Sequence, residues 1–436
     1  MNDEKIIIIG GGIIGCSTAW MLKSLNPNLK VLILEKNNQI AHEHSFQSEG
    51  IFSAAMNTPW NGYKLLRQAI DDFDNPDSLI SINPILFITI DFWIWALRFA
   101  YNSFFQFDKK IENIYKLARR TNDLHKRLYN DSRWKYNHLH ENYLGKDAGT
   151  IEIFLSDIDF NGAKRRLEVL NKKYGERLCL YSNLSRCKDI EHHLNIDSII
   201  NVKGCMKNNS EHYSAYNTQK LAEYLMRIAI EEGARIEYKA EVEGFRFENN
   251  KVVAVKIKGG EEITGDKIII CCGAHSRKIG RLLGWTPPIW PVKGYSLNIE
   301  APSRLKYSAA FTFDKPINIG SMGSYYRVSS FIEFSTIRDK DVNPEKCLYM
   351  LKNAQIILNL KKCDALGYWA FQRAVTVDDL PIIGKFPKLE NVYINAGHGA
   401  RSSSLCLASS ELISHIILGQ TPLINPHHYS PNRFWI

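Results

Sequence analysis

The sequence contains no C-x-x-C pair, although it has nine cysteines. An odd number of cysteines without paired spacing is typical neither of a zinc site nor of the disulfide framework of a small secreted protein. The first residues also lack the positive tip and the small-residue cleavage site of a signal peptide, because Asp3 and Glu4 outweigh Lys5. These absences predict a cytoplasmic protein that needs no metal or disulfide to fold.

The sequence has no long basic block and no low-complexity linker. Its 55 lysines and arginines exceed its 46 aspartates and glutamates by nine, and this excess is spread along 436 residues. Charge that is spread in this way argues against a nucleic-acid partner and suits an anionic ligand or an anionic membrane surface. The length predicts two or three domains, and the ordinary 45% of hydrophobic residues excludes a disordered chain.

No stretch is long and apolar enough to read as a transmembrane helix. The most apolar segment, residues 85–107, carries Asp91 and Arg98, and either charge is costly at the centre of a bilayer. We expect this segment to be an aromatic helix packed in a core or in an oligomer interface. The alternative is a peripheral membrane contact on the inner face of the cell membrane, with the aromatic rings at the level of the lipid headgroups.

A glycine-rich turn stands between a predicted strand and a predicted helix near the N-terminus. Residues 6–9 are isoleucines, and Gly10, Gly12 and Gly15 follow in the spacing G-x-G-x-x-G. The glycines allow a tight turn and the close approach of a pyrophosphate, while the helix N-terminus offers N–H groups to phosphate. Glu35 lies twenty residues after Gly15, at the end of a second predicted strand, where a carboxylate accepts ribose hydroxyls. These features together predict a dinucleotide ADP site.

The positions of the remaining buried strands favour FAD over NAD. One apolar run ends at Gly273 and another is followed by Gly397 and Gly399, hundreds of residues after the point where an NAD-binding domain is normally complete. We therefore predict an α/β fold in which a Rossmann-like FAD-binding domain is assembled from discontinuous segments, residues 1–58, 206–285 and 372–436. A mixed-sheet α+β substrate domain would consist of residues 59–205 and 286–371.

The pattern also predicts further helices and strands along the chain. Helices are expected over about 214–232, 343–360 and 403–417. Residues 235–242, 245–248, 252–258 and 262–264 alternate in polarity in the manner of antiparallel strands, with turns at Asn249-Asn250 and Gly259-Gly260.

Several ordered segments span nearly the whole sequence: residues 7–20 with Glu35, 41–50, 233–242, 266–276, 291–296, 371–384 and 395–399. On these segments the chain resembles the D-amino acid dehydrogenase group of the D-amino acid oxidase/glycine oxidase flavoprotein superfamily. The stretch Pro291-Val-Lys-Gly-Tyr-Ser296 favours D-amino acid dehydrogenases over glycine or sarcosine oxidases.

The resemblance implies an FAD cofactor that is bound non-covalently, since residues 367–373, where covalent relatives carry the attachment cysteine, contain none. His398 would act through its backbone rather than its ring, because the glycines on either side mark a turn pressed against a ligand. The residues implied in cofactor binding are Gly10, Gly12, Gly15, Glu35, Ser45, Val242, Gly273, Gly397, His398 and Gly399.

Two residues are implied at the substrate. Arg373 would hold a carboxylate, since the planar guanidinium makes two charge-assisted bonds and stays charged, and Tyr295 would line the pocket. The implied reaction is oxidative deamination of a D-amino acid to a 2-oxo acid and ammonia, with electrons passing to a non-oxygen acceptor such as a membrane quinone. The alternatives are a glycine- or sarcosine-type amine oxidase that uses O₂, and a non-catalytic flavoprotein that serves as an interaction or electron-transfer partner.

Three positions depart from the family pattern. The terminal turn continues with Arg401 where the family has Gly-Trp, Ser48-Glu49 replaces an Asn-Ala type pair, and Ala374 replaces the proline after Arg373. We expect Arg401 to add a cation near the flavin or the mouth of the substrate pocket, and Glu49 to place an acid near the cofactor.

Overall fold

The computed structural model describes most of the chain between residues 4 and 434. The residues in this range that it does not describe are 49, 56, 58, 61–77, 105–106, 131–143, 147–149, 177, 192, 196, 198, 200, 209–212, 302–307, 312–316, 323 and 361–362. Glu49 is therefore outside the described residues, and its expected role stays a prediction.

A six-stranded sheet joins the two ends of the chain, in the order β19-β20-β13-β1-β2-β9. Its strands are β1 (Lys5–Ile9), β2 (Lys30–Leu34), β9 (Arg235–Glu237), β13 (Lys267–Ile270), β19 (Ile382–Lys385) and β20 (Val392–Ala396). All neighbours are parallel except β19 and β20. Apolar residues fill β1 and β2 because the sheet is covered on both faces: Ile6 and Ile8 belong to one core cluster, and Ile7 and Ile9 to another.

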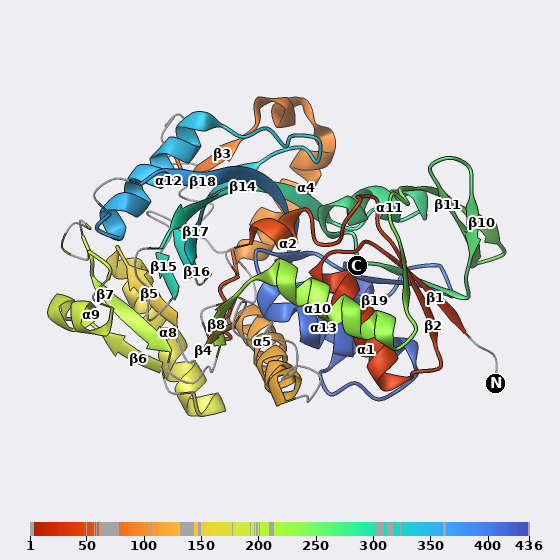
Figure 1. Ribbon diagram of the computed structural model, residues 1–436, viewed down its shortest axis with the longest axis horizontal. Helices are drawn as coiled ribbons and strands as arrows, with labels where there is room; N and C mark the ends of the chain where they lie inside the picture. The colour runs from red at the N-terminus through yellow and green to blue at the C-terminus, as the bar shows by residue number, and fades with distance from the viewer. Residues whose placement is uncertain are drawn as a thin grey trace.

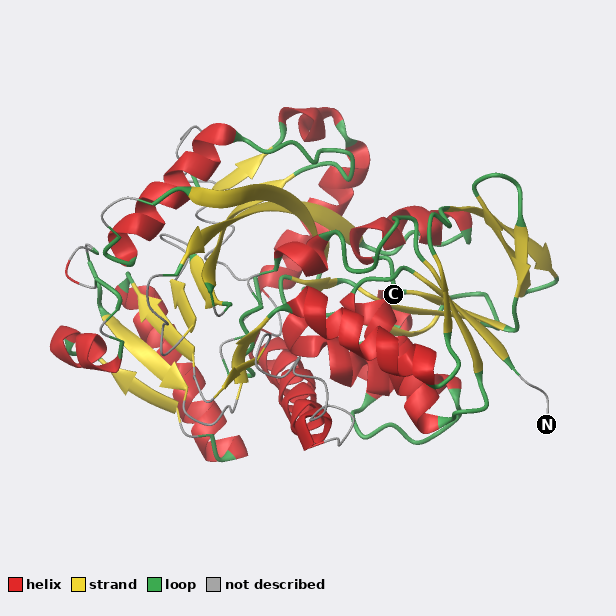
Figure 2. Cartoon of the chain, viewed as in Figure 1, coloured by secondary structure: helices red, strands yellow, loops and turns green. Residues whose placement is uncertain are grey.

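Three helices pack together on one face of this sheet (Figures 1 and 2). Helix α1 (Ile13–Leu25) contacts both α10 (Thr218–Glu231) and α13 (Ser402–Ile417), and α13 also contacts α5 (Phe107–Asn130). The helices predicted over 214–232 and 403–417 thus form within a few residues of their expected bounds, as does α12 (Pro344–Ile357).

A small antiparallel sheet covers the opposite face, and here one prediction was wrong. Strands β10 (Val242–Glu248), β11 (Lys251–Ile257) and β12 (Glu262–Thr264) pair antiparallel as predicted. The run 235–242 is not one antiparallel strand, however. Its first residues form β9 and pair parallel with β2, and Lys239 then takes a left-handed conformation, with a φ of 58°, that turns the chain towards β10.

The second large sheet is mixed, and together with the largely parallel first sheet and its helices it confirms the predicted α/β fold. Its order is β21-β18-β14-β17-β16-β15-β5-β7-β6, and β3 pairs with β17. Its long strands are β14 (Ile289–Glu300), β17 (Tyr325–Phe334) and β18 (Ala365–Thr376). The others are β3 (Ile80–Ile82), β5 (Thr150–Phe154), β6 (Leu178–Tyr181), β7 (Gly204–Asn208), β15 (Ser308–Phe311), β16 (Asn318–Ser321) and β21 (His398–Gly399).

The remaining elements are short or lie at the edges. They are α2 (His44–Gln47), η1 (Pro84–Ile88), α4 (Ile90–Phe104), β4 (Leu144–Lys146), α8 (Asp157–Tyr174), α9 (Leu184–Ile190), β8 (Tyr213–Tyr216), η3 (Gly273–His275), α11 (Ser276–Leu282), η4 (Pro426–His428) and η5 (Pro431–Phe434). Strand β21 joins the C-terminal end of the chain to β18, so the two large sheets meet there. The proposed division of the chain into two domains stays a prediction.

The aromatic segment at residues 85–107 begins with η1 and α4. One face of α4 is packed as expected, with Phe92, Trp95 and Phe99 buried, but several of its large apolar side chains are exposed. Among the described helices, none combines the length and the hydropathy that crossing a bilayer requires.

Candidate functional site

The glycine turn between β1 and α1 is shaped by backbone contacts that leave no room for side chains at two of the three glycines of the G-x-G-x-x-G pattern. A Cβ on Gly10, whose φ is 106°, would lie 2.7 Å from the carbonyl oxygen of Cys271, and a Cβ on Gly15 would lie 1.9 Å from that of Gly10. A Cβ on Gly12 would meet only the Ser45 hydroxyl, at 3.5 Å. Gly12 is therefore the open position, facing a cavity at the start of α1.

The start of α1 is the natural place for a phosphate. Gly12 is the N-cap residue and has no side chain that could cap the helix. The first N–H groups of α1 therefore need hydrogen-bond acceptors from other segments or from a ligand. The backbone N–H of Ile13 donates to the Ser45 hydroxyl at 3.1 Å, which brings the segment after Ala41 against the turn. Ser45 thus lies at the helix terminus, as its implied role in cofactor binding requires.

The Glu35 carboxylate is held in place at the end of β2. One of its oxygens accepts from the backbone N–H of Gly11 at 2.7 Å, and the other accepts from the backbone and side-chain nitrogens of Asn37, both at 2.8 Å. The residue is buried yet lines the cavity. Because Oε2 accepts only one of these bonds and has further acceptor capacity, Glu35 is fixed in a position from which it can receive a ribose hydroxyl.

A cavity of about 340 Å³ runs along the carboxyl ends of β1, β2 and β13 and reaches β18 and β21. Nine of the ten residues implied in cofactor binding line it: Gly10, Gly12, Glu35, Ser45, Val242, Gly273, Gly397, His398 and Gly399. Gly15 does not line it, because its place is behind the turn against Gly10. Segments that are hundreds of residues apart thus meet at one cavity, in the crevice where open α/β sheets bind their ligands.

The terminal turn forms the far wall of the cavity. Gly397 and Gly399 have φ values of 78° and 59°, and His398 and Gly399 pair with β18 as β21. Burial and, to a smaller extent, the nearby charge of Arg401 lower the pKa of His398 to about 3, so the ring is neutral at physiological pH. A neutral ring between two left-handed glycines agrees with an approach to the ligand through the backbone.

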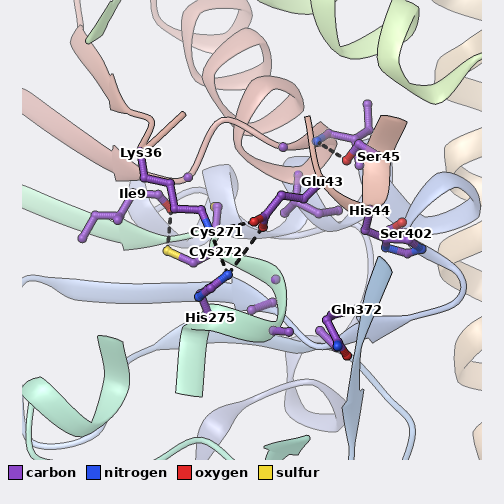
Figure 3. A pocket seen from close by; sticks show the side chains of 18 of the residues that line it. Ile9, Lys36, Glu43, His44, Ser45, Cys271, Cys272, His275, Gln372 and Ser402 are labelled. Carbon is purple, nitrogen blue, oxygen red and sulfur yellow. Dashed lines mark hydrogen bonds and ion pairs between the residues drawn. The ribbon is translucent and has the colours of Figure 1, made fainter. Parts of the chain in front are cut away.

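Four polar side chains that the sequence analysis missed line the cavity: Lys36, Glu43, His275 and Lys340. Figure 3 shows the first three of them close together. The Glu43 carboxylate lies 2.7 Å from Lys36 Nζ, 2.9 Å from Lys340 Nζ and 3.5 Å from His275 Nε2. Burial opposes ionisation of Glu43, but its bonds to His275 and Lys36 hold its pKa well below the usual range. Lys36 and Glu43 are seven residues apart, but His275 and Lys340 come from distant segments, so no local sequence signal could have grouped all four.

Arg373 is buried on β18, directly behind the cavity wall. Its Nη1 donates to the Phe331 carbonyl oxygen at 2.9 Å, and its guanidinium stacks on the rings of Phe371, at 4.6 Å, and Trp60, at 5.4 Å. Phe371 lines the cavity, whereas Arg373 itself does not. Gly294 on β14 faces the guanidinium, and a Cβ there would lie 2.0 Å from Nη1.

His44 lines the cavity and contacts the same Phe371 ring as Arg373. Its ring stacks on Phe371 with the centroids 5.1 Å apart. Burial lowers the pKa of His44 to about 3, and the charge of Arg373 acts in the same direction. The imidazole is therefore neutral at physiological pH, and the role of Arg373 at the substrate stays a prediction.

Tyr295 lies away from the cavity. Its hydroxyl donates to Glu333 at 3.0 Å, and Glu333 also pairs with Lys346 and lies 3.9 Å from Lys293. Lys293 pairs in turn with Asp339 at 2.5 Å. Tyr295 is thus part of a buried charge network beneath β14, and its implied contact with substrate stays a prediction.

Arg401, which was expected near the flavin or the mouth of the substrate pocket, is part of a buried ion pair. It is buried and pairs with Asp379, with 2.5 Å between Nη2 and Oδ1, and Nη2 also donates to the Asp379 carbonyl oxygen at 2.8 Å. Asp379 in turn accepts from the backbone N–H of Trp60. Asp379 thus compensates the charge of Arg401, and the expected place of this cation near the flavin or the mouth of the substrate pocket stays a prediction. Ala374 lies opposite Gly399 on β18 and lines the cavity.

Two curated proteins named D-amino acid dehydrogenase are similar to the chain over nearly their whole length. The one from Azorhizobium caulinodans is 25% identical and is matched over 100% of its length and 99% of this chain. The one from Vibrio vulnificus is 23% identical and is matched over 96% of its length and 95% of this chain. The resemblance drawn from the sequence segments is thereby confirmed.

Solved structures share the fold. L-proline dehydrogenase from P. horikoshii has a TM-score of 0.75 at 20% identity, covering 99% of this chain and 98% of its own. Glycine oxidase from Geobacillus kaustophilus has a TM-score of 0.74 at 17% identity, covering 98% of both chains.

The family model described as FAD dependent oxidoreductase matches residues 5–416. The cavity fits this cofactor, since it combines an open glycine and a helix terminus for a pyrophosphate with a fixed carboxylate for a ribose. The chain therefore belongs to the family of FAD dependent oxidoreductases and is an enzyme whose cofactor is FAD.

Proposed function

We propose that the enzyme oxidises a D-amino acid to a 2-oxo acid and ammonia and passes the electrons to a non-oxygen acceptor such as a quinone. The observation that carries the proposal is the buried Arg373 guanidinium behind the cavity wall on β18. A permanent cation in this place suits a ligand with a carboxylate. The similarity of the whole chain to two proteins named D-amino acid dehydrogenase supports the same reaction class.

FAD, when bound, supplies the acceptor for the hydride of the substrate. The residues of the chain bind and orient: Gly12 and the start of α1 would hold the pyrophosphate, Glu35 the ribose, and the backbone of Gly397–Gly399 the flavin. We further propose that FAD is held non-covalently, because residues 367–373 of β18 contain no cysteine. Acid precipitation should then release all of the flavin from the protein.

Arg373 would orient the substrate through its carboxylate. The guanidinium is confined by the two rings on which it stacks and by the Phe331 carbonyl that accepts from Nη1. A confined planar fork loses little side-chain entropy when it binds a carboxylate, so it can set the position of the substrate Cα above the cofactor. The His44 ring, which stacks on the same Phe371 ring, is neutral and adds no charge of its own beside the guanidinium.

Anaerobic bleaching of the flavin tests the proposal. D-amino acids should reduce the bound FAD, whereas their L-enantiomers should not, and a dye or quinone rather than O₂ should reoxidise it. Stoichiometric peroxide formation with glycine or sarcosine would instead make the protein an amine oxidase. A flavin that no amino acid or amine bleaches would contradict any catalytic role in this class.

Substitution of Arg373 tests the role of the guanidinium. Arg373→Met removes a charge-assisted bidentate contact worth about 2–4 kcal/mol, so the apparent affinity for substrate should fall by roughly 30- to 1000-fold. Arg373→Lys should restore part of this loss, and FAD content should stay close to that of the wild type. A competitive carboxylate without an amine should lose affinity in parallel. If turnover falls while carboxylate affinity is unchanged, Arg373 does not hold the carboxylate.

A further inference from the structure

Helices η1 and α4 present a continuous row of exposed apolar side chains. In this stretch Ile88 is 79% exposed, Ile90 76% and Leu97 70%. The spacing of Ile90, Ile94, Leu97 and Tyr101 places them along one side of the helix. The exposed set, which we call the outer α4 face, consists of Ile85, Phe87, Ile88, Ile90, Trp93, Ile94, Leu97, Tyr101 and Phe104.

The opposite side of α4 fastens the helix to the second sheet. Phe92 and Trp95 pack on Trp290 of β14 and Phe334 of β17, and the Trp95 indole donates to the Pro288 carbonyl oxygen at 3.2 Å. The Trp93 indole donates to the Phe87 carbonyl oxygen at 3.0 Å, which ties η1 to α4. The outer α4 face is therefore carried by a firmly packed helix, and its exposure is a property of the fold.

Basic side chains border this face. Asp91, at the start of α4, pairs with Arg277 at 2.9 Å and with Arg281 at 2.7 Å, both on α11. Arg281 is 61% exposed, and Arg98 lies over the Phe434 ring. One carboxylate and three guanidinium groups leave the border with an excess of positive charge. Such a border complements anionic lipid headgroups, for which an exposed apolar row with tryptophan and tyrosine is also suited.

We infer that the outer α4 face is a docking surface for an anionic phospholipid bilayer, in which α4 lies parallel to the membrane plane. Fifteen residues of helix span about 22 Å, less than the roughly 30 Å of a hydrocarbon core, so the helix lies in the interface rather than across it. Arg277 and Arg281 share α11 with Lys278 and Ile279, which line the cavity. Docking would thus bring the cofactor site close to the bilayer, where a lipid-soluble acceptor is dissolved.

A second copy of the chain fits this face less well. The commonest self-association joins identical patches through a two-fold axis, so the positive border of one copy would meet a patch with the same excess of positive charge. Like charges that meet in an interface are unfavourable. An anionic lipid surface meets the same border with the opposite charge. The inference does not depend on which amino acid the enzyme oxidises.

Co-sedimentation of the FAD-loaded enzyme with vesicles tests the inference. We expect binding to phosphatidylcholine vesicles that contain phosphatidylglycerol, weaker binding to phosphatidylcholine alone, and weakening by salt. Leu97→Glu should lower the binding by at least about tenfold, because it places a charge where a leucine would enter the lipid. Leu423→Glu is the matched control, since Leu423 is 68% exposed but lies outside the outer α4 face. It should leave binding within about twofold.

Two further measurements separate docking from other causes. Arg281→Gln should weaken binding to anionic vesicles more than to neutral ones, while the FAD content and the turnover with a soluble dye stay unchanged in every variant. Equal vesicle binding by Leu97→Glu and Leu423→Glu would overturn the inference, as would the absence of any binding by the wild type. A wild-type dimer that Leu97→Glu converts to a monomer would assign the face to self-association instead.

Discussion

Adding one methyl group to two glycines of the same motif should have different effects, on FAD affinity at Gly12 and on stability at Gly15. Gly12 and Gly15 are three residues apart and fit the same dinucleotide-binding pattern, yet the structure surrounds them differently. A methyl on Gly12 would meet only the Ser45 hydroxyl, at 3.5 Å, and would project into the cavity. A methyl on Gly15 would lie 1.9 Å from the Gly10 carbonyl oxygen, inside the protein.

The expected magnitudes follow from these contacts. Gly12→Ala reduces the entropy of the unfolded chain, which stabilises the protein by about 0.4–1 kcal/mol. Alanine is also a poorer N-cap, which destabilises it by about 0.5–1 kcal/mol. The two effects oppose each other, so the stability of the flavin-free protein should hardly change. The methyl would overpack the cofactor site by about 1–3 kcal/mol, which lowers FAD affinity roughly 5- to 150-fold. In Gly15→Ala the added methyl pushes the Gly10 backbone carbonyl away from α1, so the free energy of unfolding should fall by about 3 kcal/mol or more.

Two assays distinguish the variants. Denaturant unfolding of the flavin-free proteins measures stability, and titration with FAD, followed by quenching of flavin fluorescence, measures affinity. Gly12→Ala should lower the FAD affinity and leave the stability unchanged, whereas Gly15→Ala should lower the stability. Wild-type FAD affinity in Gly12→Ala, or wild-type stability in Gly15→Ala, would refute the assignment of these glycines to a cofactor-facing and a backbone-facing position.

The local part of the site could be predicted because its determinants are contiguous. The strand, turn and helix from β1 to α1, and Glu35 at the end of β2, follow from hydrophobic runs and glycine spacing within about thirty-five residues. The Glu43 cluster and the Arg401–Asp379 pair could not be predicted in this way. Their partners come together only when the sheets form, and a sequence read alone cannot tell a buried, paired arginine from an exposed one.

The aromatic helix shows a different limit. Both sides of α4 are apolar, since Phe92 and Trp95 alternate with Trp93 and Ile94. Periodicity therefore cannot decide which side packs on the sheet, and the same pattern is compatible with a buried helix and with a docked one. In the structure the side of α4 that carries Phe92 packs on Trp290 and its neighbours. Residues 235–242 were misassigned for a related reason, because a short alternating run does not reveal its partner strand.

Two further predictions concern buried ionisable groups. Burial lowers the pKa of His125 to about 3, below its unfolded value of about 6.5, so its contribution to stability is present above pH 6.5 and is lost as the pH falls towards 3. His125→Gln should remove up to about 1.4 kcal/mol per pH unit from the acid slope in denaturant unfolding, and an unchanged slope would contradict this. The Arg401–Asp379 pair calls for a double-mutant cycle. Arg401→Met leaves a carboxylate buried without its cation and should cost about 3–5 kcal/mol of stability. Adding Asp379→Asn should recover much of this loss, because the neutral amide can still accept from the Trp60 N–H. If the two losses simply add, the ion pair is not what holds Trp60 and the terminal turn together.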